Sequence, residues 1–208
     1  PRVLLLTESR KPTDTFADLP VALVPGMPPK TDRLEEAIRE VGAAAAAAER
    51  LPGAGVLDIL ARRKPRLIGD RSLPQGDSTV ESVVAALVGM SNSYVAIQGP
   101  PGTGKTFNGS RVVRELVEKH HWRVGVVAQS HAVVENMLAG IVKAGLAPAL
   151  VGKGKTESQN PTWTSLKNVP KYLVEYASSG CVIGGTAWDF ANDNTIARYS
   201  LDLLVVDE

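Results

Sequence analysis

The sequence lacks several features that mark specialised classes of protein. Its 208 residues contain one cysteine, Cys181, which excludes an internal disulfide and provides no cysteine spacing for a metal site. No apolar run reaches the roughly 18 residues that a membrane-spanning helix requires, and the run Val3–Leu6 is too short for the core of a signal peptide. We therefore expect a cytoplasmic protein with no membrane partner.

Charge of neither sign dominates the chain. Lys and Arg number 23 and Asp and Glu number 22, so the net charge of +1 excludes nucleic-acid binding through overall positive charge alone. Any contact with phosphates must come from local groups. Hydrophobic residues make up 44% of the chain, which is enough to bury a sizeable core, and the length suits one domain with an appendage.

The composition changes near residue 70, where we place a domain boundary. Residues 1–70 contain short apolar runs at 3–6 and 21–24 among prolines and glycines, followed by a long helix predicted over 31–51 and a shorter one over 55–63. This pattern predicts a small appendage of short strands and stalk-like helices.

Residues 71–208 alternate helical and strand-like segments. We predict helices over 78–88, 107–119, 133–144 and 171–178, and strands over 94–98, 123–128, 181–184 and 201–206. Residues 152–169 are polar and are expected to form a loop. Such alternation with continuously apolar strands predicts an α/β domain with a parallel sheet, helices on both faces and ligands at the carboxyl ends of the strands.

A glycine-rich segment after the first of these strands fits the pattern G-x-x-x-x-G-K-[ST]. It consists of Gly99, Pro100, Pro101, Gly102, Thr103, Gly104, Lys105 and Thr106. Glycines let successive backbone N–H groups curve around a phosphate, and the N-terminus of the following helix attracts negative charge. Lys105 supplies positive charge for the β- and γ-phosphates, and the Thr106 hydroxyl is a ligand for Mg²⁺. The segment predicts a site for ATP, with Lys105 as a catalytic residue.

An acidic pair follows the last apolar run. Asp207 comes directly after residues 203–206, so we expect it at the carboxyl end of a strand, holding Mg²⁺ together with Thr106. Glu208 is the candidate general base, because a carboxylate one residue further can orient a water molecule toward the γ-phosphate.

The loop pattern also occurs in ring-forming AAA-type ATPases, so it does not decide the class. Lys105 and Asp207 are 102 positions apart, a spacing longer than AAA-type domains use. Residues 124–137 resemble motif Ia of superfamily 1 helicases, with Gln129 and His131 in place of the usual Pro and Asn. The spacing and this motif favour the helicase class.

A second resemblance lies at residues 182–187, which are similar to motif Ic of the same helicases. By this resemblance Ser130, His131 and Thr186 are expected to contact the phosphates of a single strand. The alternative is structural: Ser130 caps the next helix and Thr186 ends a strand, and capping is compatible with phosphate contact. Lys153 and Lys155 lie in a glycine-containing loop and are expected to be exposed to solvent.

Residues 78–208 as a whole resemble the first half of a RecA-like motor domain from the branch of superfamily 1 helicases that serves nonsense-mediated decay and replication. They also resemble bacterial proteins in which a RecB-like nuclease precedes such a helicase, although no nuclease carboxylate cluster occurs here. The resemblance implies ATP and Mg²⁺ as cofactors, single-stranded nucleic acid as a partner, DNA in preference to RNA, and the remainder of a parent helicase chain. The family's adenine-reading Gln has no counterpart at 79–82, and Gln75 lies further upstream.

We expect the chain to be an ATP-binding fragment of a helicase that translocates on single-stranded DNA or RNA. Its own activity should be weak or absent, because a second motor domain and any arginine finger would lie outside it. Two alternatives remain: an AAA-type or other P-loop NTPase without strand tracking, and a non-catalytic interaction fragment.

Overall fold

The computed structural model describes residues 30–49, 53–69, 72–73, 79–100 and 102–207. The chain divides into two compact units, Pro1–Lys30 and Thr31–Glu208, and all the elements described belong to the second. The strand-like runs predicted at 3–6 and 21–24 lie outside the described residues. None of the described helices has the length and apolar character needed to cross a membrane.

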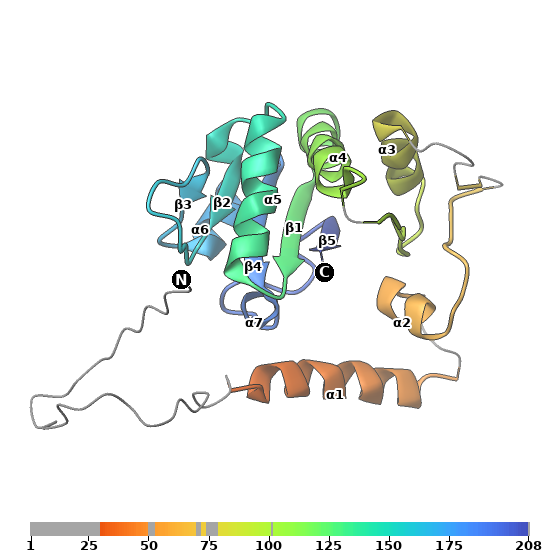
Figure 1. The fold of residues 1–208 in the computed structure, drawn as a ribbon. Coiled ribbons are helices and arrows are strands. Elements are labelled where there is room, and N and C mark those ends of the chain that lie inside the picture. The colour runs from red at the N-terminus through yellow and green to blue at the C-terminus, as the bar shows by residue number, and fades with distance from the viewer. Residues whose placement is uncertain (1–29, 50–52, 70–71, 74–78, 101, 208) are drawn as a thin grey trace, which may run out of the picture. The chain divides into compact units, whose positions relative to one another are not determined.

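The core of the second unit is a parallel sheet (Figure 1). In the described residues its strands are β1 (Arg123–Ala128), β2 (Val151–Lys153), β3 (Thr164–Ser165), β4 (Cys181–Thr186) and β5 (Leu203–Asp207). They pair in the order β3-β2-β4-β1-β5, and every pairing is parallel. This arrangement confirms the predicted α/β class with a parallel sheet and is consistent with part of a RecA-like fold.

Helices cover both faces of the sheet. The described helices are α1 (Asp32–Ala47), α2 (Gly55–Leu60), α3 (Val80–Val88), α4 (Lys105–His120), α5 (His131–Lys143), the 3₁₀ turn η1 (Pro148–Leu150), α6 (Val169–Glu175) and α7 (Ala187–Phe190), of which α4, α5 and α6 pack on the sheet. Val182 of β4 packs with the apolar side chains of α4 and α5, whereas its neighbours Cys181 and Ile183 pack with α6. Because successive side chains of a strand point to opposite faces, α4 and α5 lie on one side and α6 on the other.

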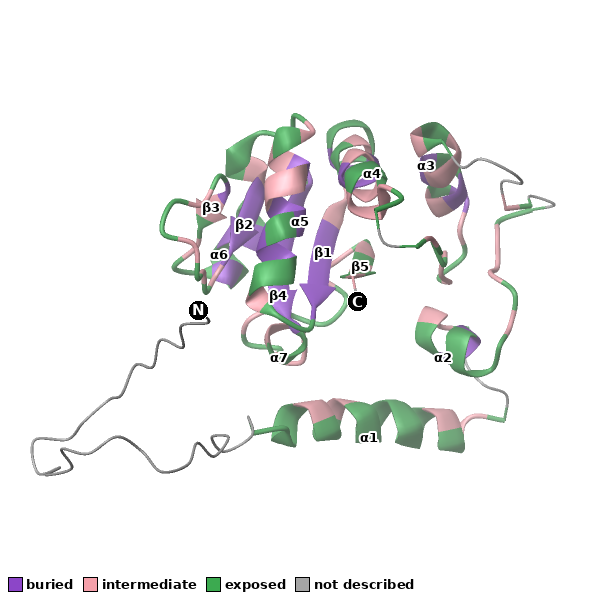
Figure 2. Cartoon of the chain, in the orientation of Figure 1, coloured by how far each residue is buried: buried purple, intermediate pink, exposed green. Residues whose placement is uncertain are grey.

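Burial follows this layering (Figure 2). Strands β1 and β4 are buried along almost their whole length, and α1 has no buried residue. Cys181 is fully buried, and burial raises the pKa of its thiol to about 11. A thiol in this environment is a weak nucleophile, so Cys181 has a packing role.

The strand predicted over residues 94–98 is wrong: these residues form no strand. Both edges of β1 are already taken, by β4 and by β5, so no buried strand offers this segment a partner. Ile97 is 57% exposed, and the Tyr94 hydroxyl donates instead to the carbonyl of Arg63 at 2.9 Å. An apolar run forms a strand only where another strand completes its hydrogen bonds.

Strands β2 and β3 lie in and beside the region expected to be a polar loop, and the sequence did not predict them. They are three and two residues long, too short for a period-2 pattern to be visible. Their register is set by neighbours, since β2 pairs with β4 on one side and with β3 on the other.

Helix α2 is tied to the segment that precedes the glycine-rich loop. Asp58 is buried and forms an ion pair with Arg66, and its carboxylate accepts a hydrogen bond from the Ser93 hydroxyl at 3.0 Å. Burial raises the pKa of Asp58, but hydrogen bonds from Arg66 and Ser93 outweigh it, so the pKa lies below its ordinary value. The predicted boundary near residue 70 remains a prediction, with this contact linking residues on either side of it.

An ion pair joins the starts of β1 and β5 and provides a stability test. Asp202 accepts from the Arg123 guanidinium at 2.9 and 3.0 Å and from its backbone N–H at 2.8 Å. The Arg123 hydrogen bond holds the pKa of Asp202 below its ordinary value. We expect Arg123→Met to lower the free energy of unfolding by about 1 kcal/mol at pH 7, measured by urea denaturation.

The contribution of this pair should depend on pH in one direction. A carboxyl whose pKa is lowered on folding stabilises the protein above its unfolded pKa of about 3.9, and the benefit is lost as the pH falls through the folded value. The difference between wild type and Arg123→Met should therefore shrink in acid. Lys119→Met, which removes an exposed pair with Glu115, serves as the control and should cost under about 0.5 kcal/mol. An equal cost for both variants would contradict this account.

Candidate functional site

Three strand ends lie side by side at the carboxyl edge of the sheet. Ala128 of β1 is in register with Thr186 of β4 on one side and with Asp207 of β5 on the other. Neighbouring strands are about 4.8 Å apart, which puts Thr186 and Asp207 roughly 10 Å from each other. Ser130 and His131 follow β1 directly and so lie at this same edge.

The glycine-rich loop reaches this edge because α4 runs parallel to α5. The Ser110 hydroxyl lies 2.6 Å from where a Cβ would stand at Gly140, and Arg114 donates to the carbonyl of Ala144 at 3.1 Å. The contact partner on α5 moves toward its C-terminus as the residue on α4 moves toward its own C-terminus. The two helices therefore run parallel, with their N-termini at the same end. Since α5 begins where β1 ends, Lys105 at the start of α4 lies on the same edge as Asp207, not on the opposite one.

The loop has the backbone conformation that its glycines allow. Gly102 and Gly104 both have φ of +81°, in the left-handed region that other residues rarely adopt. A Cβ at Gly99 would stand 2.5 Å from the Thr103 hydroxyl. Pro101 lies outside the described residues. The three glycines therefore have a steric reason for their positions.

Lys105 and Thr103 close the loop on itself. The Lys105 ammonium donates to the carbonyl of Gly99 at 2.7 Å, and it lies 3.4 Å from the carbonyl of Pro100. The Thr103 hydroxyl donates to the same Pro100 carbonyl at 2.8 Å. The ammonium is thus satisfied by backbone oxygens, which a triphosphate oxygen can replace with a stronger, charge-assisted bond.

The N-terminus of α4 is suited to an anion. Its N-cap residue, Gly104, has no side chain to satisfy the first backbone N–H groups, and the helix is 16 residues long. Uncapped N–H groups at the positive end of a helix attract phosphate. The residues present therefore fit the phosphates of a nucleotide.

The proposed metal ligands are fewer than a dedicated metal cage would need. In the part of the chain that the structure describes, no group of three or more His, Cys, Asp or Glu side chains could hold a metal ion. Mg²⁺ in phosphate sites needs only one or two protein ligands beside phosphate and water. Thr106 at the start of α4 and Asp207 at the end of β5 satisfy that number. Glu208, the candidate base, lies outside the described residues.

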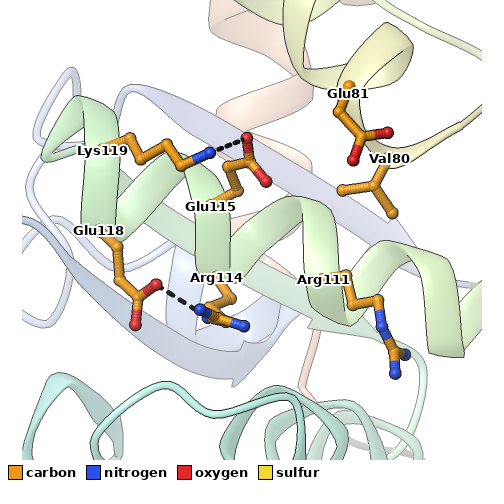
Figure 3. A pocket seen from close by; sticks show the side chains of 7 residues that line it. All are labelled: Val80, Glu81, Arg111, Arg114, Glu115, Glu118 and Lys119. Atoms are coloured by element: carbon orange, nitrogen blue, oxygen red, sulfur yellow. Dashed lines mark hydrogen bonds and ion pairs between the residues drawn. The ribbon is translucent and has the colours of Figure 1, made fainter.

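Two hollows lie along α4. One, of about 510 Å³, extends from Thr103 and Lys105 between residues 95–100 and the helices α3 and α4, with apolar walls that include Val83 and Val112. Residues 95–98, which lie outside the sheet, form one wall of this hollow, and the sequence did not predict it. The other, of about 210 Å³, lies between α3 and the last turns of α4, and Figure 3 shows its ion-paired side chains.

The candidate nucleic-acid residues have structural roles as well. The Ser130 hydroxyl caps α5 by accepting from the N–H of Val133 at 3.3 Å. The Thr186 hydroxyl donates to Asp189 at 2.9 Å in a capping box for α7, and Thr186 is 8% exposed. The structural alternative is therefore observed for both residues: Ser130 caps α5, and Thr186 ends β4, where it also caps α7.

A buried cluster behind His131 was not predicted. Lys153, which was expected to be exposed, is only 1% exposed, and this expectation is wrong. Its ammonium contacts His131 Nδ1 at 3.0 Å and Glu135 Oε1 at 3.1 Å. Gly152 and Gly154 on either side of Lys153 favoured a loop in the sequence analysis. The pairing of β2 with β4 instead buries Lys153 in the protein interior.

Comparison with known proteins supports one part of the helicase resemblance. No family model matches the chain. Over 82 residues, 39% of the chain, it is 34% identical to "Regulator of nonsense transcripts 1" of Caenorhabditis elegans, and over 83 residues, 40% of the chain, it is 34% identical to the homologue from Drosophila melanogaster. The matches cover 8% and 7% of these relatives. The similarity supports the nonsense-mediated-decay branch of superfamily 1 helicases, and nothing found supports the bacterial RecB-like detail.

Proposed function

We propose that this chain carries the nucleotide-binding part of an ATP-dependent helicase that moves along single-stranded nucleic acid. The observation that carries the proposal is the position of the glycine-rich loop, at an uncapped helix N-terminus on the same sheet edge as Asp207. The partial similarity to regulators of nonsense transcripts supports the same class.

Each residue of the edge has a chemical task in this proposal. The loop amides and Lys105 bind the β- and γ-phosphates, and Thr106 and Asp207 hold Mg²⁺ between them. The metal, when bound, neutralises charge that develops on the phosphates. Glu208 orients the attacking water, and catalysis depends on positioning more than on covalent chemistry.

The single-stranded nucleic acid would bind at the carboxyl ends of β1 and β4. Ser130 offers a hydroxyl and the first amides of α5 offer N–H groups, both suited to phosphate oxygens without reading bases. The relatives are named as regulators of transcripts, so RNA is the strand to test first and the DNA preference expected from the sequence is the comparison.

Oligonucleotide binding tests this proposal. Ser130→Gly keeps an acceptable N-cap while removing the hydroxyl, so it should weaken binding of a fluorescent oligouridylate several-fold with little loss of stability. Lys105→Met should leave oligonucleotide affinity intact. It should also remove any change in that affinity that Mg-ATP causes in the wild type. Fluorescence anisotropy with oligouridylate and oligothymidylate of equal length measures both.

The alternatives predict different outcomes. Mg-ATP binding without any strand affinity would favour an AAA-type or other P-loop NTPase. A folded chain that binds neither ligand would favour a non-catalytic interaction fragment. In the helicase case the chain itself should hydrolyse ATP slowly, since a transition-state arginine supplied from elsewhere is worth about 10³ to 10⁵ in rate.

A further inference from the structure

Lys153 is a buried cation with a complete set of acceptors. Its three partners are His131 Nδ1 at 3.0 Å, Glu135 Oε1 at 3.1 Å and the backbone carbonyl of Lys155. An ammonium has three protons to donate and no lone pair to accept with. His131 Nδ1 must therefore act as the acceptor, which leaves the proton of the neutral imidazole on Nε2.

Glu135 keeps this cation in place. Its carboxylate also accepts from the Thr156 hydroxyl at 3.1 Å and from the backbone N–H groups of Glu157 at 2.8 Å and Ser158 at 3.1 Å. Burial raises the pKa of Glu135, but hydrogen bonds from Glu157, Lys153 and Thr156 outweigh it, so the pKa lies below its ordinary value. The ionised carboxylate therefore balances the ammonium and holds the loop after β2 against α5.

The cluster lies behind the edge where the strand is proposed to bind. His131 is the first residue of α5 and is partly exposed, whereas Lys153 and Glu135 are buried. Lys153 is in register with Gly184 of β4, two residues before Thr186. The Lys–Glu pair is too deep to touch a ligand, so its effect on the surface must pass through His131.

We propose that Lys153 is a positioning residue that locks His131 in the Nε2–H tautomer, so that this N–H donates to a backbone phosphate of single-stranded nucleic acid. The proposal rests on the proposed function. A phosphodiester oxygen can only accept a hydrogen bond, so the opposite tautomer, with a lone pair on Nε2, would repel it. The contact recognises the backbone common to RNA and DNA and no base.

Nitrogen-15 NMR of the imidazole rings tests the tautomer without any ligand. The chain has three histidines, and His131→Asn assigns the signals. At about pH 8, above the ordinary titration range of histidine, His131 should show a protonated Nε2 and an unprotonated Nδ1. Lys153→Met should shift this ring toward a mixture of tautomers, and Lys155→Met, which removes a neighbouring exposed lysine, should not. A protonated Nδ1 in the wild type would overturn the proposal, even if the variant failed to fold.

Oligonucleotide affinity tests the consequence. His131→Ala and Lys153→Met should each weaken oligouridylate binding about tenfold, as expected for one hydrogen bond to a charged group, and the double variant should be no weaker than either. Lys143→Met, an equal change of charge roughly 18 Å along α5, should have a much smaller effect. Additive losses in the double variant would overturn the proposal.

The two proposals fail in different ways. A wild-type chain with the expected tautomer but no oligonucleotide affinity would refute the proposed strand binding while supporting the Lys153–His131 relation. Strand binding that depends on His131 but is unchanged by Lys153→Met would refute the positioning role alone.

Discussion

Lys105→Met is expected to remove most of the stabilisation of this chain by Mg-ATP. Nucleotide at 100 times its dissociation constant stabilises a protein by about 2.7 kcal/mol, and a hundredfold loss of affinity reduces this to about 0.4 kcal/mol. For a chain of this size the change corresponds to a melting-temperature shift of roughly 5–10 °C. Differential scanning fluorimetry with and without Mg-ATP measures it.

The reason for this large effect is the position of the ammonium. Lys105 bonds the loop carbonyls of Gly99 and Pro100, so it is already held where a β- or γ-phosphate would contact the loop amides. Lys119→Met, at the far end of the same helix, is the control and should keep the full shift. Equal shifts in wild type and Lys105→Met would rule out the proposed phosphate site.

The second large effect is expected in the core, where α5 packs on β4. A Cβ at Gly184 would stand 2.7 Å from Leu138 Cδ1 and 2.8 Å from Val134 Cγ1. Leu138 is fully buried, so Leu138→Ala should lower the free energy of unfolding by about 2–5 kcal/mol. Gly184→Ala should cost about 1–3 kcal/mol through overpacking.

The double variant separates packing from other causes. Leu138→Ala removes the atoms nearest to the methyl group that Gly184→Ala adds. The stability loss of the double variant should therefore be smaller than the sum of the two single losses, by at least about 0.5 kcal/mol. Gly42→Ala is the matched control, because no atom lies within 4 Å of its Cβ position, and it should cause no loss of stability. Urea denaturation of all four variants measures the cycle, and strict additivity would contradict the contact.

The central strands and their helices were predictable from the sequence. The strand predicted over 123–128 is β1 to the residue. β4 extends two residues beyond its prediction, and β5 begins two residues later and ends one residue later than predicted. β1 from Val124 onward and the whole of β4 are buried, and their residues there are apolar or small, so the pattern is continuous. In β5 partly buried and exposed positions alternate, but its side chains from Leu203 to Val206 are all apolar. A continuous apolar run of this kind can be recognised in the sequence without knowing which strand it pairs with.

Residues 94–98 show where that signal fails. The run is as apolar as a true strand, yet its partner must come from elsewhere, and the edges of β1 are occupied. The outer edge of β5, where Val206 is 73% exposed, is unpaired among the described strands. A free edge alone therefore does not make an apolar run a strand. The segment packs elsewhere, as the Tyr94 hydrogen bond to Arg63 shows, and the run itself does not encode that contact.

The features of the candidate site also divide into those that the sequence determines and those that depend on tertiary packing. The sequence by itself determined the glycine-rich loop, its lysine and threonine, and the acidic residue after an apolar strand, because each needs a residue type at a fixed spacing along the chain. Only the tertiary structure decided that α4 runs parallel to α5, that Thr186 is engaged by Asp189, and that Lys153 is buried against His131. These depend on which segments pack together, and packing joins atoms that lie far apart in the sequence.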